Sequence, residues 1–460
     1  MQSVKWDYRH FSIPKFNYSV HFAYAYINTM LNHRLIIKSY KHLAYLNKKG
    51  VIKLEFNYID GGITSPNGFF ASGIHCGLKR NTMKKDLALI YSEVEANGAG
   101  VYTKNKVKGA PLYITKEHLT NKKARAIVIN SGNANTCNGE DGLKKAKKTA
   151  NLQAKELKIK TDEVLVASTG VIGVPLNIDA IKSGLPRLTK SLSKEGYHDA
   201  ASAIMTTDTF QKQLALEFYV DDKKVTLAAM AKGSGMIEPN MGTMLSFITT
   251  DLNISPKLLD EALKSSTNLS YNRVSVDGDT STNDMILILA NGLAENKIIK
   301  EKDENYNLFL RALNDLNIKL AKKIAKDGEG ATKLIECRIL GASTEEDAVK
   351  LGKSVINSNL VKTAIFGSDA NWGRILCSLG YAKVNFNPEQ VDVYFESSSG
   401  SIKVCENGSS LPFDEEKARE ILLQDEIIIK VNLLLGNFNA CVWGCDLSYD
   451  YVKINGEYRS

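Results

Sequence analysis

The stretch AKGSGMIEPNMGTMLSFITTD, residues 231–251, joins a loop and a strand in one short segment. Glycine and proline are frequent in loops because they adopt or fix backbone angles that other residues resist. Residues 244–250 are apolar or β-branched, which is typical of a strand inside a sheet. The pattern therefore predicts a loop that delivers Thr243 to the start of a buried strand.

The rest of the chain mixes short strands, glycine turns and amphipathic helices. Residues 124–130 and 163–168 are apolar runs that each lead into a loop of small residues, so both are predicted strands. Residues 142–157 carry alanines and a leucine at helical spacing, with lysines opposite. The pattern predicts further elements: a helix opening at Ser255-Pro256, a helix over 309–324, and strands over 333–340, 391–396, 401–406 and 426–435. This order predicts an α/β fold without a regular βαβ repeat.

Length and charge narrow the class of protein. A chain of 460 residues buries a large core, and its length favours about two or three domains. The net charge of +8 equals that of residues 1–54 alone, which hold nine Lys or Arg and one acid. The remaining residues are electrically balanced, so we expect no broad nucleic-acid surface on the body.

Residues 1–57 are interpreted as a basic extension, poorly ordered or specific to one lineage. They are rich in aromatic residues and lack the compact apolar run of a secretory signal. A mitochondrial transit peptide is the alternative, because acids are scarce, although Arg and Ser are few. Without such a peptide we expect a cytoplasmic protein. No run approaches the roughly 18 apolar residues that cross a membrane, so no membrane partner is expected.

The cysteines and known loop motifs give no sign of a metal or cofactor. The seven cysteines are odd in number and scattered, which favours reduced thiols in a cytosolic protein. Cys441 and Cys445 have no second pair of Cys or His at ligand spacing nearby, so a metal site is not expected. Neither a Walker loop nor a GxGxxG turn after a strand is present in the sequence. We therefore expect neither metal nor cofactor.

Thr243 has one plausible route to reactivity. The body contains only His75, His118 and His198, and none lies beside a Ser or Cys in a familiar nucleophile motif, which disfavours a Ser-His-acid triad. If the peptide bond before Thr243 is cut, its own α-amino group, with a reference pKa of about 7.7–8.0, can act as the base. Composition alone leaves an ordinary loop-to-strand entry as the alternative.

A resemblance to a known family bears on that choice. Several spaced motifs resemble the ornithine acetyltransferases, also called glutamate N-acetyltransferases, in the same order along residues 58–460. They are GGITSPNGFFASGIHCGLK from Gly61, NSGNANTCNG from Asn130, ASTGVIG from Ala167, MTTD from Met205, KGSGMIEPNMGTMLSFITTD from Lys232, VDGDTSTND from Val276, DGEGATK from Asp327, FGSDANWGRI from Phe366 and WGCDLSYDYVKINGEYRS from Trp443.

The resemblance implies a self-processing precursor. Family members cleave themselves before the nucleophilic threonine, which corresponds to the bond between Gly242 and Thr243. Residues 58–242 would form the α chain and residues 243–460 the β chain. Alanine is frequent in the family where this chain has Gly242, a small-for-small change. The implied fold is an α/β layered helix-sheet sandwich of the self-processing N-terminal-threonine acetyltransferase type, with a second α/β domain.

The resemblance also implies roles for individual residues. Thr169 and Gly170 correspond to the oxyanion hole, where a hydroxyl and a glycine N–H stabilise a developing negative oxygen. A cation and an anion suit the carboxylate and ammonium of an amino acid. The implied substrate-binding residues are Thr206, Lys232, Thr243, Glu329, Asn455 and Ser460. The family often ends in Thr where this chain ends in Ser460.

The implied activity is transfer of acetyl from N2-acetylornithine to glutamate through an acetyl ester on Thr243, within arginine biosynthesis. No cofactor is implied, and the α and β chains would associate as a heterotetramer. Three alternatives stay open: a bifunctional enzyme that also takes acetyl from acetyl-CoA, an N-terminal-nucleophile amidase or aminopeptidase with water as acceptor, and a non-enzymatic protein whose basic extension binds acidic surfaces.

Overall fold

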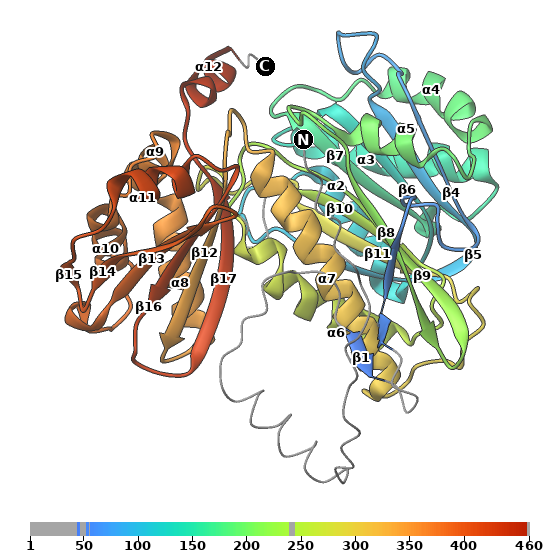
Figure 1. Cartoon of the computed structure of the whole chain (residues 1–460). Coiled ribbons are helices and arrows are strands. Elements are labelled where there is room, and N and C mark those ends of the chain that lie inside the picture. The colour runs from blue at the N-terminus through green and yellow to red at the C-terminus, as the bar shows by residue number, and fades with distance from the viewer. Residues whose placement is uncertain (1–43, 47–51, 55, 239–243, 458–460) are drawn as a thin grey trace, which may run out of the picture. The chain divides into compact units, whose positions relative to one another are not determined.

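The computed structural model describes residues 44–46, 52–54, 56–238 and 244–457 (Figure 1). Strands β1 (Ala44–Leu46) and β2 (Ile52–Leu54) pair antiparallel and belong to a unit of residues 1–54. All other elements belong to a second unit that begins at Glu55. The extension over residues 1–57 and the division between 242 and 243 stay predictions, because much of the former and all of the latter lie outside the described residues.

The larger sheet of the second unit has nine strands, in the order β3-β8-β9-β10-β11-β5-β6-β7, with β4 also paired to β5. Two neighbouring pairs, β10 with β11 and β6 with β7, are parallel. The strands are β3 (Asn57–Ile59), β4 (Phe69–Ile74), β5 (Leu87–Tyr102), β6 (Lys123–Asn133), β7 (Val164–Val171), β8 (Lys212–Val220), β9 (Lys223–Lys232), β10 (Leu245–Thr250) and β11 (Met285–Ala290).

The long strand β5 connects two halves of this sheet. Its first part pairs with β4 and β6, its last part pairs with β11, and its register to β6 shifts between Tyr91 and Ala96. One buried cluster joins Ile90 and Ile127 from the first half to Phe247 and Leu287 from the second. The two halves of the sheet therefore face each other across a shared core.

Helices cover the outer face of each half. Ile248, next to Phe247, belongs to a different buried cluster that includes α6 (Pro256–Leu269) and α7 (Glu304–Lys326). Successive strand residues point to opposite faces, so β10 is buried on both, which explains its continuous apolar run. On the other half pack α2 (Ala110–His118), α3 (Gly139–Leu157) and α4 (Ile178–Lys190), while α5 (Tyr197–Ile204) contributes to the inner core. The layered sandwich is confirmed.

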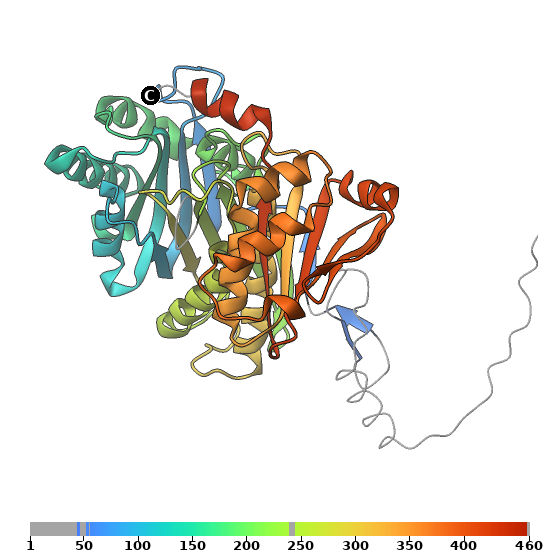
Figure 2. The same cartoon turned by 90° about the vertical axis from the view of Figure 1, so that its left-hand side faces the viewer.

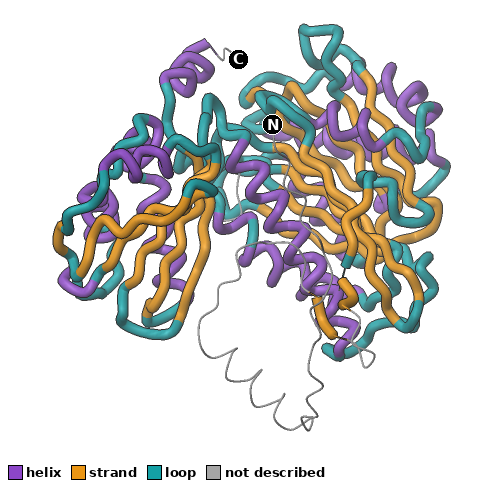
Figure 3. Tube along the Cα trace, in the orientation of Figure 1, coloured by secondary structure: helices purple, strands orange, loops and turns teal. Residues whose placement is uncertain are grey.

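The smaller sheet forms the second α/β part of the unit (Figures 2 and 3). Its helices share one apolar core with it. In sheet order the strands are β15 (Ser409–Ser410), β14 (Gly400–Glu406), β13 (Asp392–Ser397), β16 (Glu426–Asn432), β12 (Leu334–Ala342) and β17 (Phe438–Cys445). The helices are α8 (Glu345–Asn357), α9 (Asn359–Phe366), α10 (Trp372–Gly380) and α11 (Glu415–Leu422), and α12 (Tyr449–Glu457) follows β17.

The predicted elements occur with small shifts at their ends. The stripe over 309–324 lies in α7, and the runs at 124–130 and 163–168 lie in β6 and β7. Helix α6 begins at Pro256 as predicted, although the Ser255 side chain accepts no capping hydrogen bond. Helix α7 was predicted from its apolar stripe and the two strands from their apolar runs, because each of these elements has one or two buried faces.

A buried cation joins α7 to the larger sheet. Lys212, the first residue of β8, is 1% exposed, and its Nζ lies 2.7 Å from Oδ1 of Asp208. The same Nζ also contacts Oδ2 of Asp327, which follows α7 and is itself buried. A buried charge without its partners costs several kcal/mol, so these three groups depend on one another.

Lys212→Ala is expected to destabilise the protein by about 3–5 kcal/mol, because it leaves two buried carboxylates without their cation. Lys224→Ala is the matched control, since Lys224 pairs with Glu217 at 2.8 Å on the exposed surface of the same strand pair. An exposed pair contributes about 0–1 kcal/mol. Calorimetric melting of both variants beside the wild type measures the difference. Equal, small shifts in melting temperature would contradict a structural role for the buried ion cluster.

Candidate active site

One cavity of about 140 Å³ gathers six of the predicted site residues. They come from separate parts of the unit: the end of β7, the loop after α5, the end of β9, the turn after α7, and α12. The predicted residues that line the cavity are Thr169, Gly170, Thr206, Lys232, Glu329 and Asn455. The fold therefore brings together residues that lie far apart in sequence.

The end of β7 presents the two residues predicted to form the oxyanion hole. Gly170 has a φ of +128°, in the region that favours glycine, and a Cβ there would lie 2.4 Å from the carbonyl carbon of Gly132. Beyond this point the pairing of β6 with β7 becomes irregular at Asn133. Glycine thus allows the two parallel strand ends to come close together, with the half-buried Thr169 beside them.

Lys232 supplies a buried cation at the end of β9. The residue is 6% exposed, and its Nζ lies 3.5 Å from Oγ1 of Thr169. Burial lowers the pKa of Lys232 below its usual value, and the nearby carboxylate of Asp208 offsets part of that shift. Lys232 is therefore positioned to bind an anionic group next to the two residues predicted to form the oxyanion hole.

Glu329 supplies an anion to the same cavity. Its backbone N–H donates to the carbonyl oxygen of Ser234 at 2.9 Å, and Nδ2 of Asn455 donates to its Oε2 at 2.9 Å. A Cβ on Gly235 would lie 2.2 Å from that Oε2, so the missing side chain makes room for the carboxylate. Glu329 is thus held by α12 on one side and by the loop after β9 on the other.

The buried ion cluster holds the loops of the cavity in place. Asp208 accepts hydrogen bonds from the N–H of Thr206 at 3.0 Å and from the N–H of Gly233 at 2.7 Å. Burial by itself raises the pKa of Asp208, but the charges of Lys232 and Lys212 outweigh it and hold the value at about 2. Asp208 consequently stays ionised, and its carboxylate holds the backbone at Thr206 and at Gly233 in place.

Three predicted positions, Gly242, Thr243 and Ser460, lie outside the described residues. Met244, the residue after Thr243, is buried, and its carbonyl oxygen accepts a hydrogen bond from the N–H of Met285 at 3.3 Å. The first residue of β10, Leu245, is paired with Lys232 of β9. The chain therefore enters the sheet directly beside the cavity's cation.

The cavity has further lining residues for which the sequence predicted no role. Ser281, Thr282 and Asn283 belong to the quoted motif VDGDTSTND, which carried the resemblance but no assigned function. Asn283 Nδ2 donates to the carbonyl oxygens of Ala134 at 2.6 Å and Ser168 at 3.0 Å. This amide ties the loop after β6 to strand β7. The only signal in the sequence that could have predicted their place in the cavity was a run of hydroxyl and amide residues just before strand β11.

The geometry suits a zwitterionic ligand that carries an acyl group. Lys232 and Glu329 offer opposite charges, and the β7 end offers hydrogen-bond donors for an oxyanion. Within residues 56–238 and 244–457, no group of three or more His, Cys, Asp or Glu is arranged to hold a metal ion. Among the helices of the described part of the chain, none is long and apolar enough to cross a membrane.

Comparison with known proteins places the chain in a family. The ArgJ family model matches residues 70–460. The arginine biosynthesis bifunctional protein ArgJ of Caldanaerobacter subterraneus subsp. tengcongensis is 55% identical over 402 residues, covering 87% of this chain and 99% of that protein.

Two solved structures are also similar. The arginine biosynthesis bifunctional protein ArgJ of Bacillus halodurans is 46% identical, covers 47% of this chain and 100% of that chain, and has a TM-score of 0.45. The ornithine acetyltransferase of Mycobacterium tuberculosis, solved with ornithine, is 35% identical, covers 40% of this chain and 98% of that chain, and has a TM-score of 0.38. On the family model and the curated relative, the chain belongs to the ArgJ family and is an acyltransferase of arginine biosynthesis.

Proposed function

We propose that this enzyme transfers acetyl from N2-acetylornithine to glutamate, using Thr243 as the nucleophile after cleavage of the Gly242–Thr243 bond. The observation that carries the proposal is the single cavity lined by Thr169, Lys232 and Glu329. Those residues offer what the reaction needs: donors for an oxyanion, a cation for a carboxylate and an anion for an ammonium.

Self-cleavage is the first step of the proposal. The hydroxyl of Thr243 attacks the carbonyl carbon of Gly242, and the peptide bond gives way to an ester between the two residues. Water then hydrolyses the ester, which leaves a carboxylate on Gly242 and a free α-amine on Thr243. The absence of a side chain on Gly242 leaves the carbonyl open to attack.

Acetyl transfer then follows by double displacement. The α-amine of Thr243 takes the proton of its own hydroxyl, whose oxygen attacks the acetyl carbonyl of N2-acetylornithine. Thr169 and the N–H of Gly170 stabilise the oxyanion, the C–N bond breaks, and ornithine leaves with the proton. Glutamate then enters, and its amine attacks the acetyl ester to give N-acetylglutamate and free Thr243.

In this scheme Lys232 binds the α-carboxylate shared by donor and acceptor. Glu329, held by Asn455, is suited to the side-chain ammonium of the ornithine donor, and Thr206 and Ser460 add hydrogen bonds. We further propose that the α and β chains stay together as a heterotetramer in the cytoplasm. The Caldanaerobacter relative is named a bifunctional protein, which favours a second reaction in which acetyl-CoA acetylates glutamate.

Mass spectrometry of the purified protein is expected to show two fragments that meet between Gly242 and Thr243. Thr243→Ala should stay intact, because it has no hydroxyl for the acyl shift. Thr243→Ser is the matched control, since it keeps the hydroxyl and should still be cleaved. A wild-type protein that transfers acetyl while its chain remains whole would refute this mechanism.

Gly170→Ala is expected to reduce kcat of the cleaved enzyme by about 10²–10³-fold, the effect of losing one oxyanion donor. The added Cβ would lie 2.4 Å from the backbone of Gly132 and would displace the N–H of residue 170. Gly173→Ala is the control, because Gly173 also has a positive φ, +80°, but nothing within 4 Å of an added Cβ. If both variants lose kcat equally, backbone strain alone explains the loss.

The pH dependence of kcat/KM tests whether the Lys232 ammonium binds the substrate carboxylate. Its ammonium form binds the substrate carboxylate, so kcat/KM for N2-acetylornithine is expected to fall as pH rises through the lowered pKa of Lys232. This alkaline fall should begin at lower pH than the usual value of a lysine allows. In Lys232→Arg the charge persists, so the fall should move to higher pH, whatever the activity level. An unchanged alkaline limb would show that Lys232 does not set it.

A further inference from the structure

A second cavity adjoins the candidate active site. Its volume is about 590 Å³, well above the 140 Å³ of the first. Thr206 lines both cavities, and Val171 of the second directly follows Gly170 of the first along β7. The residues that line it are Gly77, Leu78, Lys79, Arg80, Asn81, Lys84, Gly132, Asn133, Val171, Val174, Pro175, Asn177 and Thr206.

The loop between β4 and β5 makes this cavity cationic. It contributes Lys79, Arg80 and Lys84, and no acidic residue is among those that line the cavity. In the part of the chain that the structure describes, the side chains of Arg80 and Lys84 form no ion pair, and both residues are exposed. Two positive charges at the cavity therefore lack a protein counter-ion.

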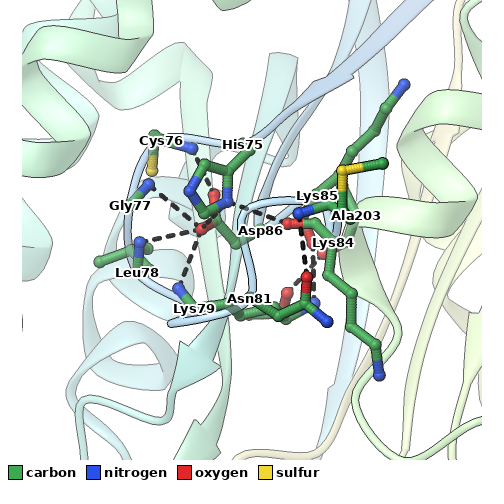
Figure 4. A network of polar contacts seen from close by, with 12 residues as sticks. His75, Cys76, Gly77, Leu78, Lys79, Asn81, Lys84, Lys85, Asp86 and Ala203 are labelled. Atoms are coloured by element: carbon green, nitrogen blue, oxygen red, sulfur yellow. Dashed lines mark hydrogen bonds and ion pairs between the residues drawn. The ribbon is translucent and has the colours of Figure 1, made fainter.

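The loop is held in shape by a buried carboxylate (Figure 4). Asp86, fully buried, accepts hydrogen bonds from successive backbone N–H groups, among them those of Cys76 at 2.6 Å, Leu78 at 2.8 Å and Lys79 at 3.0 Å. The ring of His75 adds a contact of 3.0 Å between Nδ1 and Oδ2 of Asp86. The cationic loop is thus shaped before any ligand arrives.

Lys79 connects this loop to the active-site cavity. Its Nζ donates to the carbonyl oxygens of Lys85 and Met205, both at 2.7 Å, and Met205 directly precedes Thr206. Burial lowers the pKa of Lys79 to about 8, with Asp86 opposing the shift. Lys79 is therefore committed to positioning the loop, which leaves Arg80 and Lys84 for a ligand.

We propose that the second cavity binds the phosphate groups of a coenzyme A thioester, with the acyl carbonyl at Thr169 and Gly170. This inference rests on the proposed acetyl-transfer function and identifies the site of a second donor. Guanidinium and ammonium groups bind phosphates through charge-assisted hydrogen bonds. The volume lies in the range of about 300–1,000 Å³ that is usual for cofactor-sized ligands.

The remaining lining fits the other parts of such a donor. Val171, Val174 and Pro175 provide apolar contact along the segment that leads from the oxyanion hole. In the reaction, the Thr243 hydroxyl attacks the thioester carbonyl, the C–S bond breaks, and the coenzyme A thiolate takes the proton from the Thr243 α-amine. The product is the same acetyl ester on Thr243 that N2-acetylornithine gives, so glutamate completes both reactions.

The test compares Arg80→Ala/Lys84→Ala with Lys297→Ala/Lys300→Ala. Both double variants remove two positive charges, but neither Lys297 nor Lys300 lines the cavity and both are exposed. Calorimetry with coenzyme A is expected to give a Kd about 10- to 100-fold higher in the first variant only. Dephospho-coenzyme A should bind the wild type more weakly than coenzyme A, and acetyl-S-pantetheine, which has no phosphate, should bind both variants alike.

Activity measurements separate this inference from the proposed function. Acetylglutamate formation from acetyl-CoA should fall in the Arg80/Lys84 variant through a higher KM, while transfer from N2-acetylornithine changes by less than about 2-fold. Coenzyme A that fails to bind the wild type, or binds all three proteins equally, overturns the inference. The inference is also overturned if ADP binds as tightly as coenzyme A and the wild-type enzyme forms no acetylglutamate from acetyl-CoA. A wild-type enzyme that does not transfer acetyl from N2-acetylornithine to glutamate refutes the proposed function instead. The calorimetric comparison of coenzyme A binding stays valid in that case.

Discussion

The pairing of buried Lys212 with Asp208 and Asp327 is the interaction on which the site depends. Each carboxylate lies within two residues of a cavity residue: Asp208 follows Thr206, and Asp327 precedes Glu329. Asp208 also accepts from Gly233, the neighbour of Lys232, and the Ser234 hydroxyl donates to the carbonyl oxygen of Asp327 at 2.6 Å. Because buried charges are stable only when paired, one cation fixes three loops relative to one another.

Within the same cluster, Asp208 opposes the effect of burial, which lowers the pKa of Lys232. The oxygens of Asp208 are already used by Lys212 and by the N–H groups of Thr206 and Gly233. Asp208 therefore favours the Lys232 ammonium through its electrostatic field, and the described residues show no ion pair between the two side chains. In the proposed reaction this leaves the ammonium available to a carboxylate. The carboxylate of Glu329, in contrast to the Lys232 ammonium, is held by a hydrogen bond from Asn455 and lines the cavity.

The sequence predicted α7 from its repeating apolar pattern and β10 from its continuous apolar run, because such patterns reflect whether one face or both faces of an element are covered. The site residues came from the family resemblance, and their convergence on one cavity is a fact of topology that no local pattern contains. The ion cluster could not be predicted, since Lys212 and Asp327 are 115 residues apart in sequence. The loop GLKRNTMKK, residues 77–85, has the composition of an ordinary solvated charge run, and only the hydrogen bonds to Asp86 distinguish it.

The end of β7 links the two proposed donors. A zwitterionic donor needs one cation and one anion near its acyl group, and Lys232 and Glu329 meet that need in the small cavity. A coenzyme A thioester carries its negative charge far from its acyl carbon, so its phosphates require cations in a separate, larger cavity. Thr169 and Gly170 lie on the strand segment that passes from one cavity to the other. On this proposal both acyl carbonyls reach the same oxyanion donors, and one nucleophile serves a zwitterionic donor and an anionic donor.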